Sequence, residues 1–299
     1  MQTKIFKTPD FDLSYYYIKD TQSDAVTVVC CGGLGGTHLV WSPFVRSLRD
    51  KYPILIWNYP GLAPGDDLDE NVDVSVPALA GYLGELLRHE NLDRVFLVGW
   101  SLGVQVAVEY ATRGNGPKGA LTGLAAICGV AGQPFAAKTY SDPFKAVFKV
   151  KRSSWPSALG WLSERLDRID RLRSLLSGID SPTRWAKRFG LVDPLIDELL
   201  FDAVVRDFLS VDVAVYNRYA RAAAEHDATG ELGNLSLPAL VVSGERDKFA
   251  LPERLKEMES LLPHGEYFEV RGATHYLPLE YGPLLALKID DFMMRQGIS

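Results

Sequence analysis

Short, largely apolar runs recur along the chain and are separated by longer stretches of mixed character. The runs cover residues 26–31, 54–57, 95–98, 121–128, 239–243 and 267–270. Such runs are typical of strands buried on both faces of a parallel sheet. Helices are predicted at residues 41–48, 76–87, 104–110, 252–262 and 284–294, and an early strand at 11–18 that can form a hairpin with the segment around Ile5. This alternation predicts a parallel sheet covered by helices on both faces.

The strand–helix alternation stops near Gly132 and resumes at Ala239. The interval between them lacks strand signals, and its apolar residues recur at helical spacing at Leu159, Leu162, Leu166, Ile169, Leu172 and Leu176, with another helix beginning at Leu195, Ile196, Leu199 and Leu200. We therefore expect a helical cap at residues 133–226, inserted into a core made of residues 1–132 and 227–299. We expect the cap over the carboxyl ends of the strands, where open α/β sheets bind ligands.

One strand–helix junction carries a recognisable motif, Gly99-Trp100-Ser101-Leu102-Gly103. A buried strand precedes the motif and a helix follows it, so Ser101 lies on a very tight turn. Glycine at both ends allows the neighbouring elements to approach closely, and the turn presents the serine hydroxyl at the start of the helix. This pattern predicts a nucleophile elbow with Ser101 as the nucleophile. The simpler interpretation is a glycine-rich turn with a serine N-cap.

A serine hydroxyl is a weak nucleophile and needs a base, which in turn needs an orienting acid. Four of the five histidines have weak context, whereas His275 follows the predicted strand 267–270 in a loop, at the carboxyl edge that also carries Ser101. Asp247 lies just past the strand 239–243, on the same edge. Glu245 is the rival acid. We predict Ser101, Asp247 and His275 as nucleophile, acid and base, in that order along the chain.

The anionic oxygen of a tetrahedral intermediate needs N–H donors that are already in place. We predict the N–H of Leu102, at the start of the elbow helix, and the N–H of Leu34, in the glycine loop 32–36. A dinucleotide-binding loop is the alternative for these glycines. Its third glycine position falls on His38, and the next strand ends at Asn58 rather than an acid, so we expect no such cofactor.

Taken together, these motifs resemble the α/β-hydrolase fold superfamily, of the kind with a helical cap. The resemblance covers nearly the whole core and implies a mostly parallel, doubly wound, eight-stranded sheet. The elbow is similar to that of the pimeloyl-carrier methyl ester esterases. Gly32-Gly33 stands where the family usually has His-Gly, and Val104 where a second glycine is common. Serine at position 101 argues against the haloalkane dehalogenase and epoxide hydrolase branches, which use aspartate there.

Composition and charge limit the partners, cofactors and cell compartment that we expect for this chemistry. The 299 residues carry a formal net charge of −6, which gives no indication of nucleic-acid binding. We expect no signal peptide and no membrane span, because no apolar run approaches the ~18 residues that a span requires. Three cysteines, two of them adjacent, make a disulfide framework improbable and favour a cytoplasmic location. No cysteine–histidine spacing resembles a metal site, so no metal and no cofactor is expected.

The predicted cap differs in charge from the rest of the chain. Between Lys138 and Arg188 there are 12 basic residues against 5 acidic ones. Such a segment is either a solvated helix face with ion pairs along it or a docking surface for an acidic carrier protein or an anionic acyl substrate.

The function predicted is a serine hydrolase that cleaves a small-molecule carboxylic ester or thioester through an acyl-enzyme. Hydrolysis of carbon–carbon bonds and cofactor-free perhydrolysis are alternatives with the same three residues. A non-catalytic ligand receptor on this fold is a third alternative.

Overall fold

The computed structural model describes residues 2–19, 25–113, 120–134 and 181–298. The predicted helix at 159–176 and most of the basic segment 138–188 lie outside these residues. The domain boundaries at 132/133 and 226/227 therefore stay a prediction.

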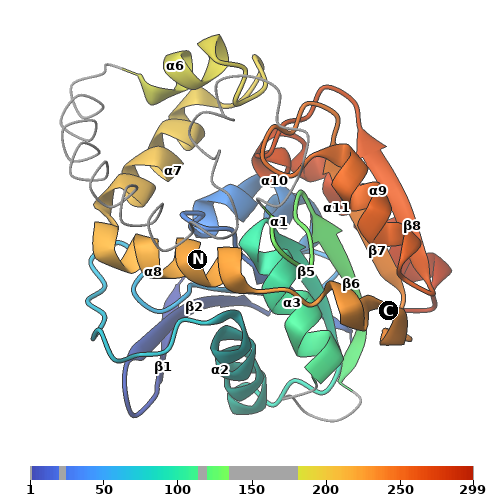
Figure 1. The fold of residues 1–299 in the computed structure, drawn as a ribbon, viewed down its shortest axis with the longest axis horizontal. Helices are drawn as coiled ribbons and strands as arrows, with labels where there is room; N and C mark the ends of the chain where they lie inside the picture. Colours follow the sequence, from blue (N-terminus) through green and yellow to red (C-terminus); the bar gives the residue numbers. More distant parts are fainter. Residues whose placement is uncertain (1, 20–24, 114–119, 135–180, 299) are drawn as a thin grey trace.

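The described residues form one eight-stranded sheet with the order β1-β2-β4-β3-β5-β6-β7-β8 (Figure 1). Its strands are β1 (Thr3–Lys7), β2 (Asp12–Ile18), β3 (Thr27–Cys31), β4 (Ile54–Trp57), β5 (Val95–Trp100), β6 (Leu121–Ile127), β7 (Ala239–Gly244) and β8 (Gly265–Val270). The hairpin β1–β2 and the pair β2–β4 are antiparallel, and all other pairs are parallel. The sheet class predicted from the sequence is confirmed.

Helices cover both faces of the sheet, as the apolar runs predicted. The core helices are α1 (Ser42–Leu48), α2 (Val76–His89), α3 (Leu102–Arg113), α9 (Pro252–Ser260), α10 (Leu277–Glu280) and α11 (Gly282–Arg295), with 3-10 turns η1 (His38–Trp41) and η3 (Thr229–Asn234). Helices α2, α3 and α9 pack on one face, and α1 and α11 on the other. Successive residues of a strand point to opposite faces, so Val28 joins the α1–α11 core and Val29 the α2–α3 core.

The described part of the predicted insertion, residues 181–226, contains helices. It contains α6 (Pro182–Arg188), α7 (Glu198–Ser210) and α8 (Val213–Glu225), which lie to the left and top of the sheet in Figure 1. Helix α7 begins at Glu198, three residues later than the apolar pattern suggested, because the Asp197 carboxylate accepts the N–H of Leu200 and caps the helix there. Leu195 and Leu199 are 92% and 82% exposed.

The two boundaries of the predicted insertion lie next to each other in the structure. A β-bridge joins Gly132 to Asp227, and the Gln133 N–H donates to the His226 carbonyl at 3.0 Å. Helix α8 is tied to the core by Tyr219, whose hydroxyl donates to the Pro60 carbonyl at 2.7 Å. Within the described ranges, no helix has the length and apolar character needed to cross a membrane.

Candidate active site

Ser101 occupies a strained turn between β5 and α3. Its φ is +56°, in the left-handed region that non-glycine residues rarely adopt. A Cβ at Gly99 would lie 2.4 Å from the Gly103 carbonyl oxygen, and a Cβ at Gly103 would lie 2.0 Å from the Cys31 carbonyl oxygen. Both positions therefore require glycine. The Ser101 N–H donates to Ile127 at the end of β6, which anchors the turn at the carboxyl edge of the sheet.

A continuous hydrogen-bonded chain runs from the serine through the histidine to the aspartate. His275 Nε2 lies 3.0 Å from Ser101 Oγ, and His275 Nδ1 lies 2.9 Å from Asp247 Oδ2. Because a carboxylate only accepts, Nδ1 carries the proton and Nε2 is free to accept from the serine hydroxyl. Three residues that are 146 and 28 positions apart along the chain thus form one unit.

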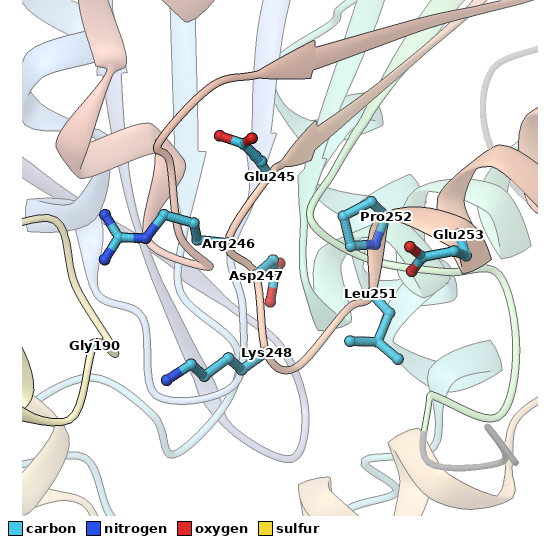
Figure 2. Close-up of a pocket in the computed structure, with 8 residues that line it drawn as sticks. All are labelled: Gly190, Glu245, Arg246, Asp247, Lys248, Leu251, Pro252 and Glu253. Atoms are coloured by element: carbon cyan, nitrogen blue, oxygen red, sulfur yellow. The ribbon is translucent and has the colours of Figure 1, made fainter. Parts of the chain in front are cut away.

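Asp247 is held in a single orientation. It is 3% exposed, and its Oδ1 accepts the N–H groups of Phe249 at 2.8 Å and Ala250 at 2.9 Å, which leaves Oδ2 for the histidine. Glu245 points in a different direction (Figure 2) and accepts the Gly272 N–H at 2.8 Å on the exposed side of the loop. The structure therefore brings Asp247, and not Glu245, to His275.

The acid and base loops meet because β7 and β8 are parallel neighbours. The Arg246 N–H donates to the Ala273 carbonyl at 2.9 Å, directly beyond the two strand ends. A Cβ at Gly244 would lie 2.7 Å from the same Ala273 oxygen, so glycine is needed for this close approach. The Phe249 ring then packs against the imidazole of His275, with centroids 5.0 Å apart.

The two predicted oxyanion donors flank the serine. Leu102 is the first residue of α3, and Leu34 lies in a turn closed by the Gly36 N–H and the Gly33 carbonyl at 3.1 Å. A Cβ at Gly33 would lie 3.0 Å from Ser101 Cβ, so the glycine loop passes directly beside the nucleophile. Neither N–H, of Leu34 or of Leu102, donates to an acceptor among the described residues. Their role as donors to a substrate oxygen stays a prediction.

Trp100 connects the glycine loop to the histidine, a role that the sequence did not indicate. Its Nε1–H donates to the His275 backbone carbonyl at 2.7 Å. Its ring fills the space over the loop, since a Cβ at Gly36 would lie 2.3 Å from it and one at Gly33 would lie 2.8 Å from it. The residue before the nucleophile therefore holds the backbone of His275, and the motif alone carries no signal for this contact.

A polar pocket of about 430 Å³ lies beside the acid loop (Figure 2). It is lined by Gly190, Glu245, Arg246, Asp247, Lys248, Leu251, Pro252 and Glu253. Neither Ser101 nor His275 lines it, and five of its eight residues are charged. It flanks Asp247 from the solvent side.

Cys30, Cys31 and Cys128 are buried free thiols, and burial raises the pKa of each. No group of three or more His, Cys, Asp or Glu side chains in the described part of the chain is arranged to hold a metal ion.

An eight-stranded, mostly parallel sheet with a serine at the turn after β5 is the architecture of the α/β-hydrolases. The chain belongs to the alpha/beta hydrolase family, whose model matches residues 28–286.

The three relatives described next share 20% to 28% sequence identity with this chain. Over 256 residues the chain is 28% identical to the polyketide synthase ThaQ of Burkholderia thailandensis, which covers 85% of this chain. It is 22% identical to the uncharacterized hydrolase YugF of Bacillus subtilis, with 94% of each chain covered. The enol-lactonase of Burkholderia xenovorans superposes with a TM-score of 0.74 at 20% identity, covering 97% of this chain and 100% of the enzyme. The chain spans only 11% of the length of ThaQ.

Proposed function

We propose that this protein hydrolyses carboxylic esters or thioesters through an acyl-enzyme on Ser101. The observation that carries the proposal is the unbroken chain of hydrogen bonds from Ser101 Oγ through His275 to Asp247. It lies at the carboxyl edge of the sheet, where α/β folds bind their ligands.

In the proposed reaction, Ser101 Oγ attacks the acyl carbon while its proton moves to His275 Nε2. Asp247 holds the imidazole in the required tautomer and stabilises the imidazolium that forms. The N–H groups of Leu34 and Leu102 donate to the developing oxyanion. Collapse of the intermediate breaks the bond to the alcohol or thiol, which leaves with the histidine proton. Water then attacks the acyl-enzyme with His275 as base and releases the carboxylic acid and Ser101.

Within this range of substrates, we include acyl thioesters beside oxygen esters, and the similarity to a stretch of the polyketide synthase ThaQ is one reason to test both. A thioester held on an acidic carrier protein would also benefit from the excess of basic residues between Lys138 and Arg188. Matched oxygen esters and thioesters of the same acyl group separate the two classes by their kcat/KM values.

The test of the mechanism is the Ser101→Ala variant, assayed with a fluorophosphonate probe and with chromogenic esters of increasing chain length. We expect the loss of all labelling and a fall in kcat on the order of 10⁴–10⁶. Ser47→Ala is the matched control, because Ser47 is exposed and its hydroxyl donates only to the Pro43 carbonyl. Ester turnover that survives in Ser101→Ala would exclude the mechanism. Labelling of the parent protein without turnover of any ester would favour a ligand receptor.

A further inference from the structure

Glu280 is a partly buried carboxylate that the proposed reaction does not use. It is the last residue of α10. Its Oε2 accepts the Thr274 N–H at 2.8 Å, and its Oε1 accepts the Thr274 hydroxyl and the Asp193 N–H, both at 2.7 Å. No cation forms an ion pair with it within the described residues, and burial raises the pKa of its carboxyl group above 4.5. Hydrogen bonds therefore account for its position.

The arrangement requires a carboxyl group in particular. Two backbone N–H groups, from Thr274 and Asp193, point at different oxygens of Glu280. A glutamine has one oxygen and one NH₂ group, so either orientation of its amide would set a donor against one of these backbone donors. Backbone N–H groups left without an acceptor in a buried site are costly. Glu280 thus joins two segments that a neutral amide cannot join.

The first of these segments carries the base. Thr274 is 1% exposed and directly precedes His275. The His275 carbonyl is held from the other side by Trp100 Nε1 at 2.7 Å. The imidazole is therefore attached to a backbone that is fixed at two consecutive residues, by Glu280 and by Trp100.

The second segment belongs to the insertion. Residues 189–193 lie between α6 and α7, and Val192 in their middle is fully buried. The Leu191 carbonyl lies 3.0 Å from the Thr274 hydroxyl, and the Tyr281 hydroxyl donates to Asp193 Oδ2 at 3.2 Å.

The same segment also contacts the acid loop. Lys248, the residue after Asp247, donates to the Phe189 carbonyl at 2.8 Å. Residues 189–193 are thus bonded to the loops that carry both the acid and the base.

We propose that Glu280 is a positioning residue, which joins the His275 loop to residues 189–193 so that the base is aligned with Ser101 only while this segment of the insertion is docked. The inference rests on the proposed function for its kinetic consequence. The structural part of the inference is that Glu280 links the His275 loop to residues 189–193, and this part does not depend on the proposed function.

The experiment compares Glu280→Gln with Glu245→Gln. Glu245 is the matched control, because it also bonds the base loop but accepts only one N–H, that of Gly272, which a glutamine oxygen can still accept. In Glu280→Gln we expect kcat for a chromogenic ester to fall about 10- to 100-fold, as a small misplacement of a catalytic group would cause, while KM stays near the parent value. Glu245→Gln should keep the parent kcat.

Amide hydrogen exchange tests whether Glu280 links the two segments, and this measurement needs no substrate turnover. Glu280→Gln should raise exchange in residues 189–193 and 272–276 together. Tyr281→Phe, which removes only the bond to Asp193, should raise it in 189–193 alone and reduce kcat less. Parent kcat in Glu280→Gln, or faster exchange spread over the whole sheet, would overturn the proposal. If the parent hydrolyses no ester or thioester, the proposed function fails, and exchange in the two segments still decides whether Glu280 links them.

Discussion

Two histidine–carboxylate pairs lie along helix α3, and they are built differently. At the start of the helix, beside Ser101, His275 Nδ1 donates to Asp247 at 2.9 Å. About two turns further on, Glu109 Oε2 faces His226 Nε2 at 3.6 Å, at the root of the insertion. Both carboxylates are buried, yet among the described residues only the first pair has its hydrogen bonds complete.

The difference lies in the neighbours of each pair. Asp247 has two further backbone donors, and the second nitrogen of His275 faces a serine hydroxyl. In the other pair, Glu109 Oε2 and His226 Nε2 have no hydrogen-bond partner among the described residues, although Arg113 lies 3.2 Å from Glu109 Oε1.

The protonation of the second pair follows from this setting. Burial lowers the pKa of His226 to about 4, with Arg113 acting in the same direction, and burial raises the pKa of Glu109. A histidine next to a carboxylate is therefore not by itself a reactive pair. The partner on its second nitrogen and the donors on the carboxylate decide its chemistry.

Replacing each carboxylate by its amide should give the largest difference in kcat between the two pairs. Asp247→Asn should reduce kcat by about 10⁴, because an amide stabilises the wrong tautomer of His275. Glu109→Gln should leave kcat near the parent value, although it also lies beside a buried histidine. The measurement is steady-state hydrolysis of a chromogenic ester by variants shown to be folded by circular dichroism. A severe loss in Glu109→Gln, with Asp247→Asn active, would reverse the assignment of the two pairs.

A smaller effect is expected from the group that holds the backbone of His275. Trp100→Phe keeps a ring over Gly33 and Gly36 but removes the indole donor to the His275 carbonyl. The loss of one neutral hydrogen bond, about 0.5–1.5 kcal/mol, should lower kcat roughly 2- to 10-fold. Trp57→Phe is the control, since the Trp57 indole N–H meets no oxygen or nitrogen acceptor among the described residues. Equal kcat values for the two variants would mean that the Trp100 bond does not position the base.

The smallest effect concerns stability rather than turnover. The pKa of His226 is about 4 in the folded protein against 6.5 for the unperturbed side chain, so the unfolded chain binds the proton first. The free energy of unfolding should therefore be at its full value above pH 6.5 and decline as the pH falls toward 4.

His226→Gln should flatten this decline in urea titrations at several pH values, while turnover at neutral pH stays unchanged. His264→Gln, in the exposed turn before β8, should keep the slope of the parent. A slope that is the same in the parent and in His226→Gln would show that other groups cause the acid sensitivity.

Much of the core could be predicted from the chain because its signals are local. The apolar runs at 26–31 and 239–243 became the strands Thr27–Cys31 and Ala239–Gly244, in which every residue is buried. The glycines around Ser101 were predicted to permit a tight turn, and the structure shows backbone atoms where their side chains would lie. His275 and Asp247 could be selected because parallel strands bring their carboxyl ends to one edge, whatever the strand order.

Other features depended on contacts that no local pattern encodes. The sequence placed the start of α7 at Leu195 from its apolar spacing, whereas the Asp197 cap sets it at Glu198. Glu280 carried no motif, and its two partners come from separate segments of the fold, one of them 87 residues away.

By itself, the sequence determined the sheet, the elbow and the residue types at its edge, because burial and backbone strain act over a few neighbouring positions. Tertiary structure decided the contacts that separate the two candidate acids. Asp247 and Glu245 are two residues apart, and only the packing of the β7 and β8 loops turns one toward His275 and the other toward Gly272. Hydrogen bonds depend on angles and distances of a few tenths of an ångström, and these are set when distant segments pack together.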